Sequence, residues 1–368
     1  MKKRIFAPII ILACTILCSC SMQKTVTRVI TPEDDQTPSI PVLNVSSQSL
    51  QARRYLGISP DGNLIFRKSA AGQNNSSVID TVTTEQPDGQ KVLKTYPLTE
   101  NVFDCMLIDG GRSVIFCTER YDVKNVCLLN LESGEVETLG YYNTATINGY
   151  SGQYVFSEPD STLIHIVTIK DNDTLNLDTI DAEHKVEYES ELFSGLSNYI
   201  AENNITRIFR LSNNNICVEY KTGSIYTVAD VTRMVKLCES TKPTCGTDKL
   251  FYIDTEYKLV MMEVHEEESI CYTLAEDVNN FAVSGDQTRI AYTVSSVGNG
   301  AEKLFVSDVF GKNRTALDAA NSYTSLSMNS DGTSLVAALP AANTGSTLRS
   351  ETTLMTYTLA SSDEDSEN

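Results

Sequence analysis

The chain has 368 residues, which is enough for two domains of average size or for one large domain built from repeats. It contains 29 Lys and Arg against 48 Asp and Glu, and the net charge of −19 excludes nucleic acid as a partner, because binding to a phosphate backbone needs clustered Lys and Arg. The same negative charge disfavours direct docking of the protein surface on anionic lipid.

Residues 1–19 have the pattern of a secretory signal peptide. Three positive residues, Lys2–Arg4, precede an apolar core of thirteen residues, Ile5–Leu17. Thirteen residues are too few to span a bilayer, which needs about 20, and they match the apolar core of a signal peptide. Removal of this segment takes away three positive charges and no acidic residue, so the net charge changes from −19 to −22.

A lipidation site is predicted at Cys20. The run Leu17-Cys18-Ser19-Cys20 resembles the lipobox of bacterial lipoproteins, with Leu three residues before the modified cysteine and a small residue directly before it. The resemblance implies that Cys20 is diacylated and becomes the mature N-terminus. Each buried lipid methylene contributes about 0.8 kcal/mol, so we expect an extracytoplasmic protein anchored in the cell membrane or outer membrane. An ordinary secretory signal or an uncleaved anchor is the alternative.

Polar segments flank a predicted domain of residues 41–360. Residues 20–40 are rich in threonine and have no clear periodicity, which predicts a flexible linker that carries the lipid. Residues 361–368, SSDEDSEN, form an acidic tail that we expect to be disordered.

Seven cysteines follow Cys20, so at least one thiol is unpaired. They are Cys105, Cys117, Cys127, Cys217, Cys238, Cys245 and Cys271. Several lie in apolar runs, where Cys behaves as a small hydrophobic residue. Cys117 with Cys127, or Cys238 with Cys245, would be close enough in sequence for a disulfide. The chain has no paired C-x-x-C motif, and we expect no zinc site.

Short alternating apolar runs, separated by Gly, Asp, Asn and Ser, continue through the predicted domain and indicate an all-β fold. Only Glu191–Asn203 has a helix-like period. The run YLGISPDGNLIF from Tyr55 aligns without gaps to YVFSEPDSTLIH from Tyr154. Looser copies begin at Met106, Arg210, Cys245, Phe281 and Leu326.

The middle of the second predicted strand gives each copy a landmark residue. These landmarks are Ile65, Ile115, Ile164, Val218, Phe251, Ala291 and Val336. Successive landmarks are 33 to 54 residues apart, and their mean spacing of about 45 is the length of a propeller blade. A second apolar hairpin follows the landmark, and two hairpins for each period predict a four-stranded blade.

The sixth copy resembles a known repeat family. The segment RIAYTVSSVGNGAEKLFVSDVFGKNRTAL at 289–317 is similar to the TolB-type, WD-repeat-like propeller repeat, also found in relatives of prolyl oligopeptidase. The resemblance covers most of residues 50–360. The chain has no Trp and therefore lacks the Trp-Asp dipeptide of true WD repeats. The resemblance implies the fold alone, because this repeat type serves many functions.

We predict a β-propeller of seven four-stranded blades. Six or eight blades are alternatives, because the gaps of 33 and 54 residues depart from the mean. The last copy lacks an outer strand, and the strand-like run Ile40–Leu50 has no blade of its own. We therefore expect Ile40–Leu50 to pair with Leu354–Thr358 and to close the ring, which removes unpaired strand edges.

The sequence contains no recognisable catalytic, metal or cofactor motif, and we expect none of these sites. His165 lies in a strand-like run, His184 in a turn-like run, and His265 lacks the second histidine of the H-E-x-x-H pattern. The acidic run at 171–178 lacks two of the ligands that an EF-hand loop requires. The Asp-Gly pairs at 61–62 and 331–332 are expected to be hairpin turns.

Four tyrosines lie near the junction of the second and third copies, at Tyr141, Tyr142, Tyr150 and Tyr154. They would offer a stacking platform for sugars or peptides, with packing between blades as the alternative.

The combined pattern predicts a non-enzymatic, lipid-anchored propeller that binds or scaffolds an envelope or extracellular protein, a peptide or a glycan. The alternative is a polysaccharide lyase or glycoside hydrolase that uses carboxylates in the central funnel. A sensor or assembly factor beside a membrane complex is a third hypothesis. Two carboxylates with a His or Arg in the funnel would indicate an enzyme, whereas an apolar or aromatic face would indicate a binding partner.

Overall fold

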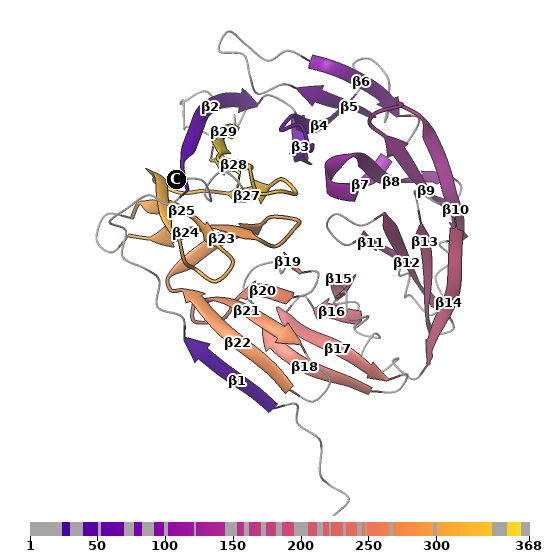
Figure 1. Ribbon diagram of the computed structural model, residues 1–368. Helices are drawn as coiled ribbons and strands as arrows, with labels where there is room; N and C mark the ends of the chain where they lie inside the picture. The colour runs from indigo at the N-terminus through magenta and orange to yellow at the C-terminus, as the bar shows by residue number, and fades with distance from the viewer. Residues whose placement is uncertain are drawn as a thin grey trace, which may run out of the picture.

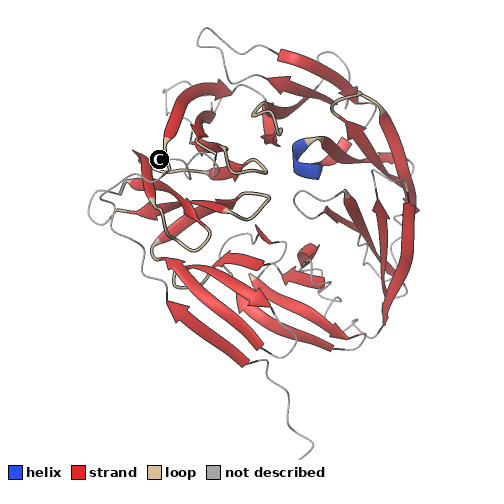
Figure 2. Ribbon diagram, in the orientation of Figure 1, coloured by secondary structure: helices blue, strands red, loops and turns tan. Residues whose placement is uncertain are grey.

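In the computed structural model, the described residues form almost only β-strands, with one short 3-10 helix among them, η1 (Asp109–Gly111) (Figure 2). The structure describes residues 24–29, 40–50, 53–69, 77–82, 92–98, 102–120, 123–143, 153–157, 162–170, 174–181, 186–194, 205–211, 216–220, 222–230, 233–240, 245–246, 249–264, 268–296, 300–340 and 352–361. Among these residues no helix is long and apolar enough to span a membrane.

The described strands form seven sheets, and five of the sheets consist of four strands in chain order with antiparallel neighbours. The first two of these contain β3 (Arg53–Ile58), β4 (Leu64–Ser69), β5 (Ser77–Val82) and β6 (Val92–Leu98), then β7 (Val102–Ile108), β8 (Ser113–Arg120), β9 (Val123–Asn130) and β10 (Val136–Asn143). The next two contain β11 (Gln153–Ser157), β12 (Leu163–Lys170), β13 (Thr174–Asp181) and β14 (Val186–Ser194), then β15 (Ile205–Arg210), β16 (Ile216–Tyr220), β17 (Ser224–Asp230) and β18 (Arg233–Glu239). The fifth contains β23 (Val278–Val283), β24 (Arg289–Ser295), β25 (Glu302–Asp308) and β26 (Thr315–Ala320).

The other two sheets each include a strand from the start of the chain. One has β19 (Cys245–Gly246), β20 (Lys249–Ile253), β21 (Leu259–Val264) and β22 (Glu268–Ala275), with β1 (Lys24–Val29) at its edge. The other has β27 (Ser325–Met328), β28 (Ser334–Leu339) and β29 (Thr352–Leu359), with β2 (Val42–Leu50) at its edge. The sheets stand around a common centre, with their first strands innermost (Figure 1). The chain therefore has the predicted all-β propeller fold.

The phase of the repeat was predicted correctly. Each of the seven landmark residues lies in the second strand of its sheet, and each is at most 2% exposed. Alternate residues of β4 show why this strand is apolar on both faces. Ile65 packs with the β7–β10 sheet, whereas Leu64 and Phe66 pack with Val336 and other residues of the β27–β29 sheet. The β3–β6 sheet is thus buried between two neighbouring sheets.

Strand β2 pairs antiparallel with β29, in a register that places Asn44 opposite Thr358 and Gln48 opposite Leu354. These are the two segments that the sequence predicted to pair. Three apolar residues of β2 are exposed at this edge, and Leu43 is the most exposed at 61%.

The predicted linker of residues 20–40 is wrong in part, because six of its residues form β1 and its last residue belongs to the core. Ile40 is buried, and its backbone N–H donates to Thr315 Oγ1 at 3.0 Å. Strand β1 is rich in Thr and Val, which favour strands wherever a partner edge is present. The signal peptide, Cys20 and residues 362–368 of the acidic tail lie outside the described residues.

The helical turn considered for Glu191–Asn203 is also wrong where the structure describes it. Residues up to Ser194 belong to β14, and Glu191 and Leu192 pair with Leu177 and Asn176 of β13. Pairing with a neighbouring strand has overridden the local period, as is common for short amphipathic runs.

Candidate functional site

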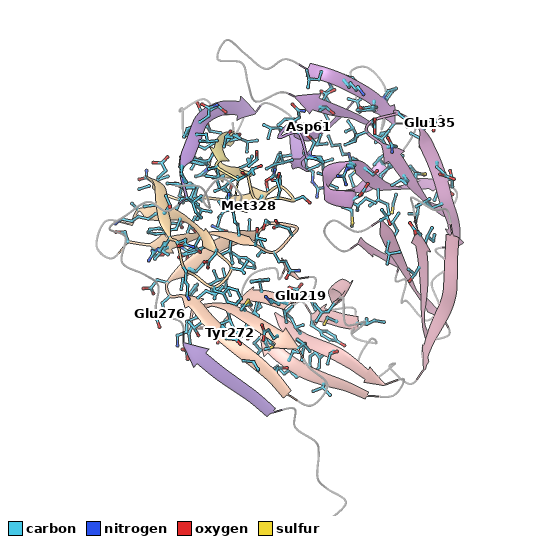
Figure 3. The ribbon with its side chains drawn as sticks, viewed as in Figure 1. Asp61, Glu135, Glu219, Tyr272, Glu276 and Met328 are labelled. Atoms are coloured by element: carbon cyan, nitrogen blue, oxygen red, sulfur yellow. The ribbon has the colours of Figure 1, made fainter. Side chains whose placement is uncertain are left out.

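The inner ends of four neighbouring sheets enclose a cavity of about 360 Å³. The lining residues come from the ends of β3, β7, β23 and β27 and from the turns that follow them. Met328 lies on the inner side of the ring, whereas Glu135 and Glu276 lie near the outer rim on opposite sides (Figure 3). A volume in this range accommodates a side chain or a small group rather than a folded element.

The cavity is apolar and uncharged. Its described lining includes Leu56, Ile108, Phe281, Val283 and Met328, together with glycines and a few small polar residues, but no Asp, Glu, Lys, Arg or His. Proton transfer and nucleophilic attack need titratable or nucleophilic groups in the site. The described lining supplies three polar side chains, two serines and one asparagine, so its chemistry suits apolar contact.

The polar side chains of the cavity are engaged with the fold. The Ser327 hydroxyl lies 2.7 Å from the Tyr55 hydroxyl, in a contact that joins β27 to β3. Asn329 accepts a hydrogen bond from the Ser334 backbone N–H at 2.8 Å, and its Nδ2 donates to Thr333 Oγ1 at 3.1 Å. Burial raises the pKa of the Tyr55 hydroxyl well above its usual value, an effect only partly offset by its hydrogen bond. Tyr55 is therefore neutral at ordinary pH.

Glycine at position 111 allows two turns of neighbouring sheets to approach closely beside the cavity. Gly111 has φ of +91°, and a Cβ atom there would lie 2.4 Å from the carbonyl oxygen of Ile58. No side chain fits at that distance, and the positive φ is itself unfavourable for other residues. The close contact sets how far the β3 and β7 ends are from each other.

An aspartate occupies each of the four turns beside the cavity. The four are Asp61, Asp109, Asp286 and Asp331. The structure gives Asp109 a partner, since its Oδ1 lies 3.4 Å from Arg112 Nη1, whereas the other three are exposed. We call these four residues the acidic rim. Four anionic side chains against two cationic ones, Arg112 and the buried Arg289, leave these turns with an excess of negative charge.

The aspartates also build the turns that hold them. Asp286 Oδ1 accepts from the Thr288 backbone N–H at 3.0 Å, and Asp331 Oδ1 accepts from the Thr333 N–H at 3.0 Å. Gly62, which follows Asp61, has φ of +74°, and Gly332, which follows Asp331, has φ of +70°. The predicted role of the Asp-Gly pairs as turn residues is therefore confirmed.

Two hydrogen bonds to backbone carbonyl oxygens of the 329–333 turn connect the β23–β26 sheet to the β27–β29 sheet at the mouth of the cavity. The N–H of Asp286 donates to the carbonyl oxygen of Ser330 at 2.9 Å, and Arg289 Nη1 donates to the carbonyl oxygen of Gly332 at 3.1 Å. Arg289 is only 4% exposed, so its guanidinium makes this contact inside the fold and not at the surface. The mouth is thus pre-formed by contacts between sheets.

The sequence missed the cavity but contained a signal for it. The lining residues are the last residues of each first strand and the small residues of the turn after it, which occupy equivalent places in the copies from Tyr55, Met106, Phe281 and Leu326. Aligning the copies by their turns identifies these places. Nothing local indicates that four particular copies meet around one space.

The tyrosine platform stays a prediction. Tyr141 and Tyr142 lie in β10, the outermost strand of its sheet, whereas Tyr154 lies in β11, the innermost strand of the next. The strand order thus separates them along the radius. Tyr150 lies outside the described residues, as do the side chains of the other three.

Six cysteines whose side chains the structure describes form no disulfide. Cys105, Cys117, Cys127, Cys217 and Cys271 are buried, and Cys238 is partly buried. A Cys117–Cys127 disulfide is wrong, because the register pairs Cys117 with Val126 and Cys127 with Phe116. This one-residue offset places the two thiols on opposite faces of the sheet. A Cys238–Cys245 disulfide is also wrong, because Cys238 is a thiol that forms no disulfide.

The described residues contain no group of three or more His, Cys, Asp or Glu that could hold a metal ion. His165 lies in β12, where its side chain is not among those described, and His184 and His265 lie outside the described residues.

Sheets with antiparallel neighbours that stand around a common centre define a β-propeller, and the inner strands of four of these sheets line an apolar cavity. No protein-family model and no curated protein matches the sequence. Among solved structures, the chain is similar to the Cps50 (Swd1) β-propeller domain of Myceliophteria thermophila, with 11% identity, a TM-score of 0.50, and coverage of 87% of this chain and 100% of that one.

Two further structures show a looser similarity. The β-propeller domain of the Trilobed protease from Pyrococcus furiosus has 12% identity and a TM-score of 0.47, with 78% of this chain and 91% of that chain covered. TolB from Acinetobacter baumannii has 10% identity and a TM-score of 0.37, with coverage of 73% and 64%. At such identities the similarity to the Cps50 domain shows the propeller fold alone.

Proposed function

We propose that this protein is a lipid-anchored, extracytoplasmic propeller that binds a protein or peptide partner through the mouth of its channel. The observation that supports this function best is the apolar, uncharged lining of the cavity. An apolar side chain of a partner would lose its contact with water there, at about 25 cal/mol for each Å² buried. A glycan would find few free hydrogen-bonding groups in the described lining.

The acidic rim predicts that the partner is positively charged where it contacts the rim. A peptide with Lys or Arg on both sides of an apolar residue would place its cations beside Asp61, Asp286 and Asp331 while the apolar residue enters the cavity. Complementary charge at a rim increases the association rate and the specificity, and it makes binding sensitive to salt. The preferred ligand is therefore a basic segment with an apolar centre.

Two labelled peptides test this function. Both have a central Leu-Phe, flanked by Lys in one and by Glu in the other, and binding is read by fluorescence anisotropy. We expect the Lys-flanked peptide to bind at least tenfold more tightly and to lose affinity in 1 M salt, where the Debye length falls to about 3 Å. Equal binding of both peptides, or binding of neither, would overturn the proposal, and so would turnover of a polysaccharide without peptide binding.

Charge-matched variants show whether the rim is responsible. Asp61→Asn with Asp331→Asn removes two charges and keeps the Asp331 side-chain oxygen that accepts from the Thr333 N–H. We expect a loss of affinity for the Lys-flanked peptide. Glu135→Gln with Glu276→Gln removes two charges from the outer rim and should leave that affinity unchanged. Ala282→Leu, which fills the cavity, should weaken binding whatever the flanks.

The anchor is tested separately. Lipidation at Cys20 predicts that the protein partitions into detergent and incorporates labelled fatty acid, and that Cys20→Ser abolishes both. A soluble wild-type protein without label would overturn the anchor while leaving the channel site standing.

We also infer that the seven sheets are seven blades of one closed ring, with β2 as the outer strand of the last blade. The packing of Phe66 in the first sheet against Val336 and Leu354 in the last supports this closure. Deletion of residues up to Leu50 would then expose β29 as an edge and lower the unfolding temperature. An unchanged unfolding temperature would contradict it.

A further inference from the structure

Strand β1 lies along β22 on the outer side of the ring (Figure 1). The two strands are parallel, and their register runs without interruption from Lys24 opposite Glu268 to Val29 opposite Thr273. Among the strand pairs that the structure describes, this one is parallel and the others are antiparallel. A segment far away in the sequence has thus been added to the edge of a completed four-stranded sheet.

Strand β22 is buried along much of its length, although it is the outermost antiparallel strand of its sheet. In β22, Ser269, Cys271 and Thr273 are 2%, 4% and 8% exposed. The outermost strand of the β3–β6 sheet carries no such cover, and five of its seven residues are exposed. Strand β26 is also partly solvated, with three of its six residues exposed. An outermost strand is normally half solvated, so the burial of β22 matches an edge that is covered.

The composition of β1 suits this position. Thr25, Val26, Thr27 and Val29 are β-branched and favour a strand. The register sets Lys24 opposite Glu268, residues of opposite charge. Addition of a strand to a sheet edge binds mainly through backbone hydrogen bonds and protects the edge from other chains.

We propose that β1 is a docked tether that fixes how the propeller stands on the membrane. This inference rests on the proposed lipidation of Cys20. Only three residues separate Cys20 from Lys24, so the lipid lies within about 14 Å of the start of β1, at 3.3–3.6 Å for each residue. The outer edge of β22 therefore faces the lipid surface.

This orientation has a consequence for the channel. The ring stands on its rim, so the channel axis runs parallel to the membrane and both of its mouths stay open to partners. If residues 20–40 were not docked, they would behave as a coil with an end-to-end distance of about 25 Å and would impose no orientation on the ring. The acidic surface alone could not hold the ring against anionic lipid, since its net charge is −19 over the full chain.

Energy transfer from a donor dye to an acceptor in the bilayer tests the orientation in the full-length, lipidated protein on phosphatidylcholine vesicles. One donor is attached at Glu276→Cys, beside the end of β22, and another at Glu135→Cys, on the opposite side of the ring. The unsubstituted protein, treated with the same dye, gives the background from native thiols. We expect strong transfer from position 276 and weak transfer from 135; equal transfer from the two sites would overturn the proposal.

A broken tether supplies the control. Thr25→Pro with Thr27→Pro removes two backbone donors and the strand, and the two positions should then give similar transfer. Thr25→Val with Thr27→Val preserves the strand and should retain the difference.

Hydrogen exchange separates this proposal from the lipid anchor. If the wild type does not float with vesicles, the anchor fails, and docking is then read in solution without lipid. The proline variant should exchange the β22 amides at least about tenfold faster than the valine variant, because the edge is uncovered. Equal exchange in the two variants would show that β1 does not dock.

Discussion

The hydroxyl groups of Tyr55 and Ser327 lie 2.7 Å apart, although the two residues are 272 positions apart in the chain. Tyr55 belongs to the first strand of the first sheet, and Ser327 to the first strand of the last. The same contact borders the channel cavity, which Ser327 lines. This hydrogen bond therefore joins the first sheet to the last sheet, and it does so at the wall of the candidate site.

Tyr55→Phe tests this link. The change leaves the ring in place and removes the hydroxyl, and we expect the free energy of unfolding to fall by about 1 kcal/mol, the usual net value of one buried hydrogen bond. Urea unfolding measures it. Tyr257→Phe, at an exposed tyrosine, is the matched control and should leave stability unchanged. A loss no larger than that of the control would mean that the contact contributes nothing to the junction.

Two glycines with positive φ separate backbone strain from lack of space. Gly111 has φ of +91° and no room for a Cβ atom, whereas Gly300 has φ of +68° and nothing within 4 Å. We expect Gly300→Ala to cost about 1 kcal/mol from conformation alone. Gly111→Ala should cost considerably more, because the β3 and β7 turns must also move apart. Thermal unfolding compares the two, and equal losses would contradict the close approach.

The repeat could be predicted from sequence because its signals are local. The Pro-Asp-Gly residues at 60–62 and the Asp-Gly residues at 331–332 predict hairpin turns from local sequence alone, and an apolar second strand follows each of them. Strand β1 could not be predicted in the same way. Its partner β22 begins at Glu268, 244 positions after Lys24. An edge that accepts a strand leaves no mark on the strand's own sequence beyond its Thr and Val content.

The site was less predictable than the fold. Sequence reasoning identified Asp61 and Asp331 as turn residues. The hydrogen bond of Asp331, the backbone bond from Gly62 to Ser59 and the positive φ of Gly62 and Gly332 show that role. Their second property, a place beside a shared cavity, depends on which sheets become neighbours. The cavity has no sequence motif, because strand ends and small residues such as Gly57 and Gly285 form much of its lining.

A buried ion pair in the first sheet should contribute strongly to stability. Lys68 Nζ lies 2.6 Å from Asp80 Oδ2, and the Asp80 side chain is fully buried. Thr95 Oγ1 donates to its other oxygen at 2.8 Å. Lys68→Met leaves that carboxylate buried without its cation, and we expect a loss of about 3 kcal/mol in chemical unfolding.

The exposed pair of Lys236 and Glu239 is the control for this prediction. Both side chains are about half exposed, and solvent screens such pairs. Lys236→Met should leave the unfolding midpoint within error of the wild type. Similar losses for the two methionine variants would show that burial of Asp80 does not decide the cost.

Alkaline pH should destabilise the interface between the β23–β26 and β27–β29 sheets. Burial, reinforced by the charges of Asp318 and Glu302, raises the pKa of the Tyr323 hydroxyl to about 12. Between pH 10 and 12 the folded protein retains a proton that the unfolded chain has lost, so its stability is complete below pH 10 and falls as the pH rises.

Tyr323→Phe should flatten that decline by about 1–3 kcal/mol between pH 10 and 12. The buried Tyr323 hydroxyl has no hydrogen-bond partner in the described part of the chain, so its removal should be neutral or slightly stabilising at pH 7. Urea midpoints measured from pH 7 to 12 give both results. A variant curve parallel to the wild type over the whole range would refute the role of Tyr323.

The thiols should react slowly while the protein is folded. Burial raises the pKa of the Cys127, Cys238 and Cys271 thiols above the usual value, and charge repulsion among neighbouring thiols adds to the effect at Cys238. Because the thiolate is the reactive form, the rate of alkylation at pH 8 should fall for each of them. Peptide mass spectrometry after iodoacetamide treatment should find Cys238 modified first, since it is the least buried of the described cysteines, and Cys217 and Cys271 only after unfolding in urea. Rapid modification of Cys271 in the native protein would contradict its burial in the core that β22 shares with the β15–β18 sheet.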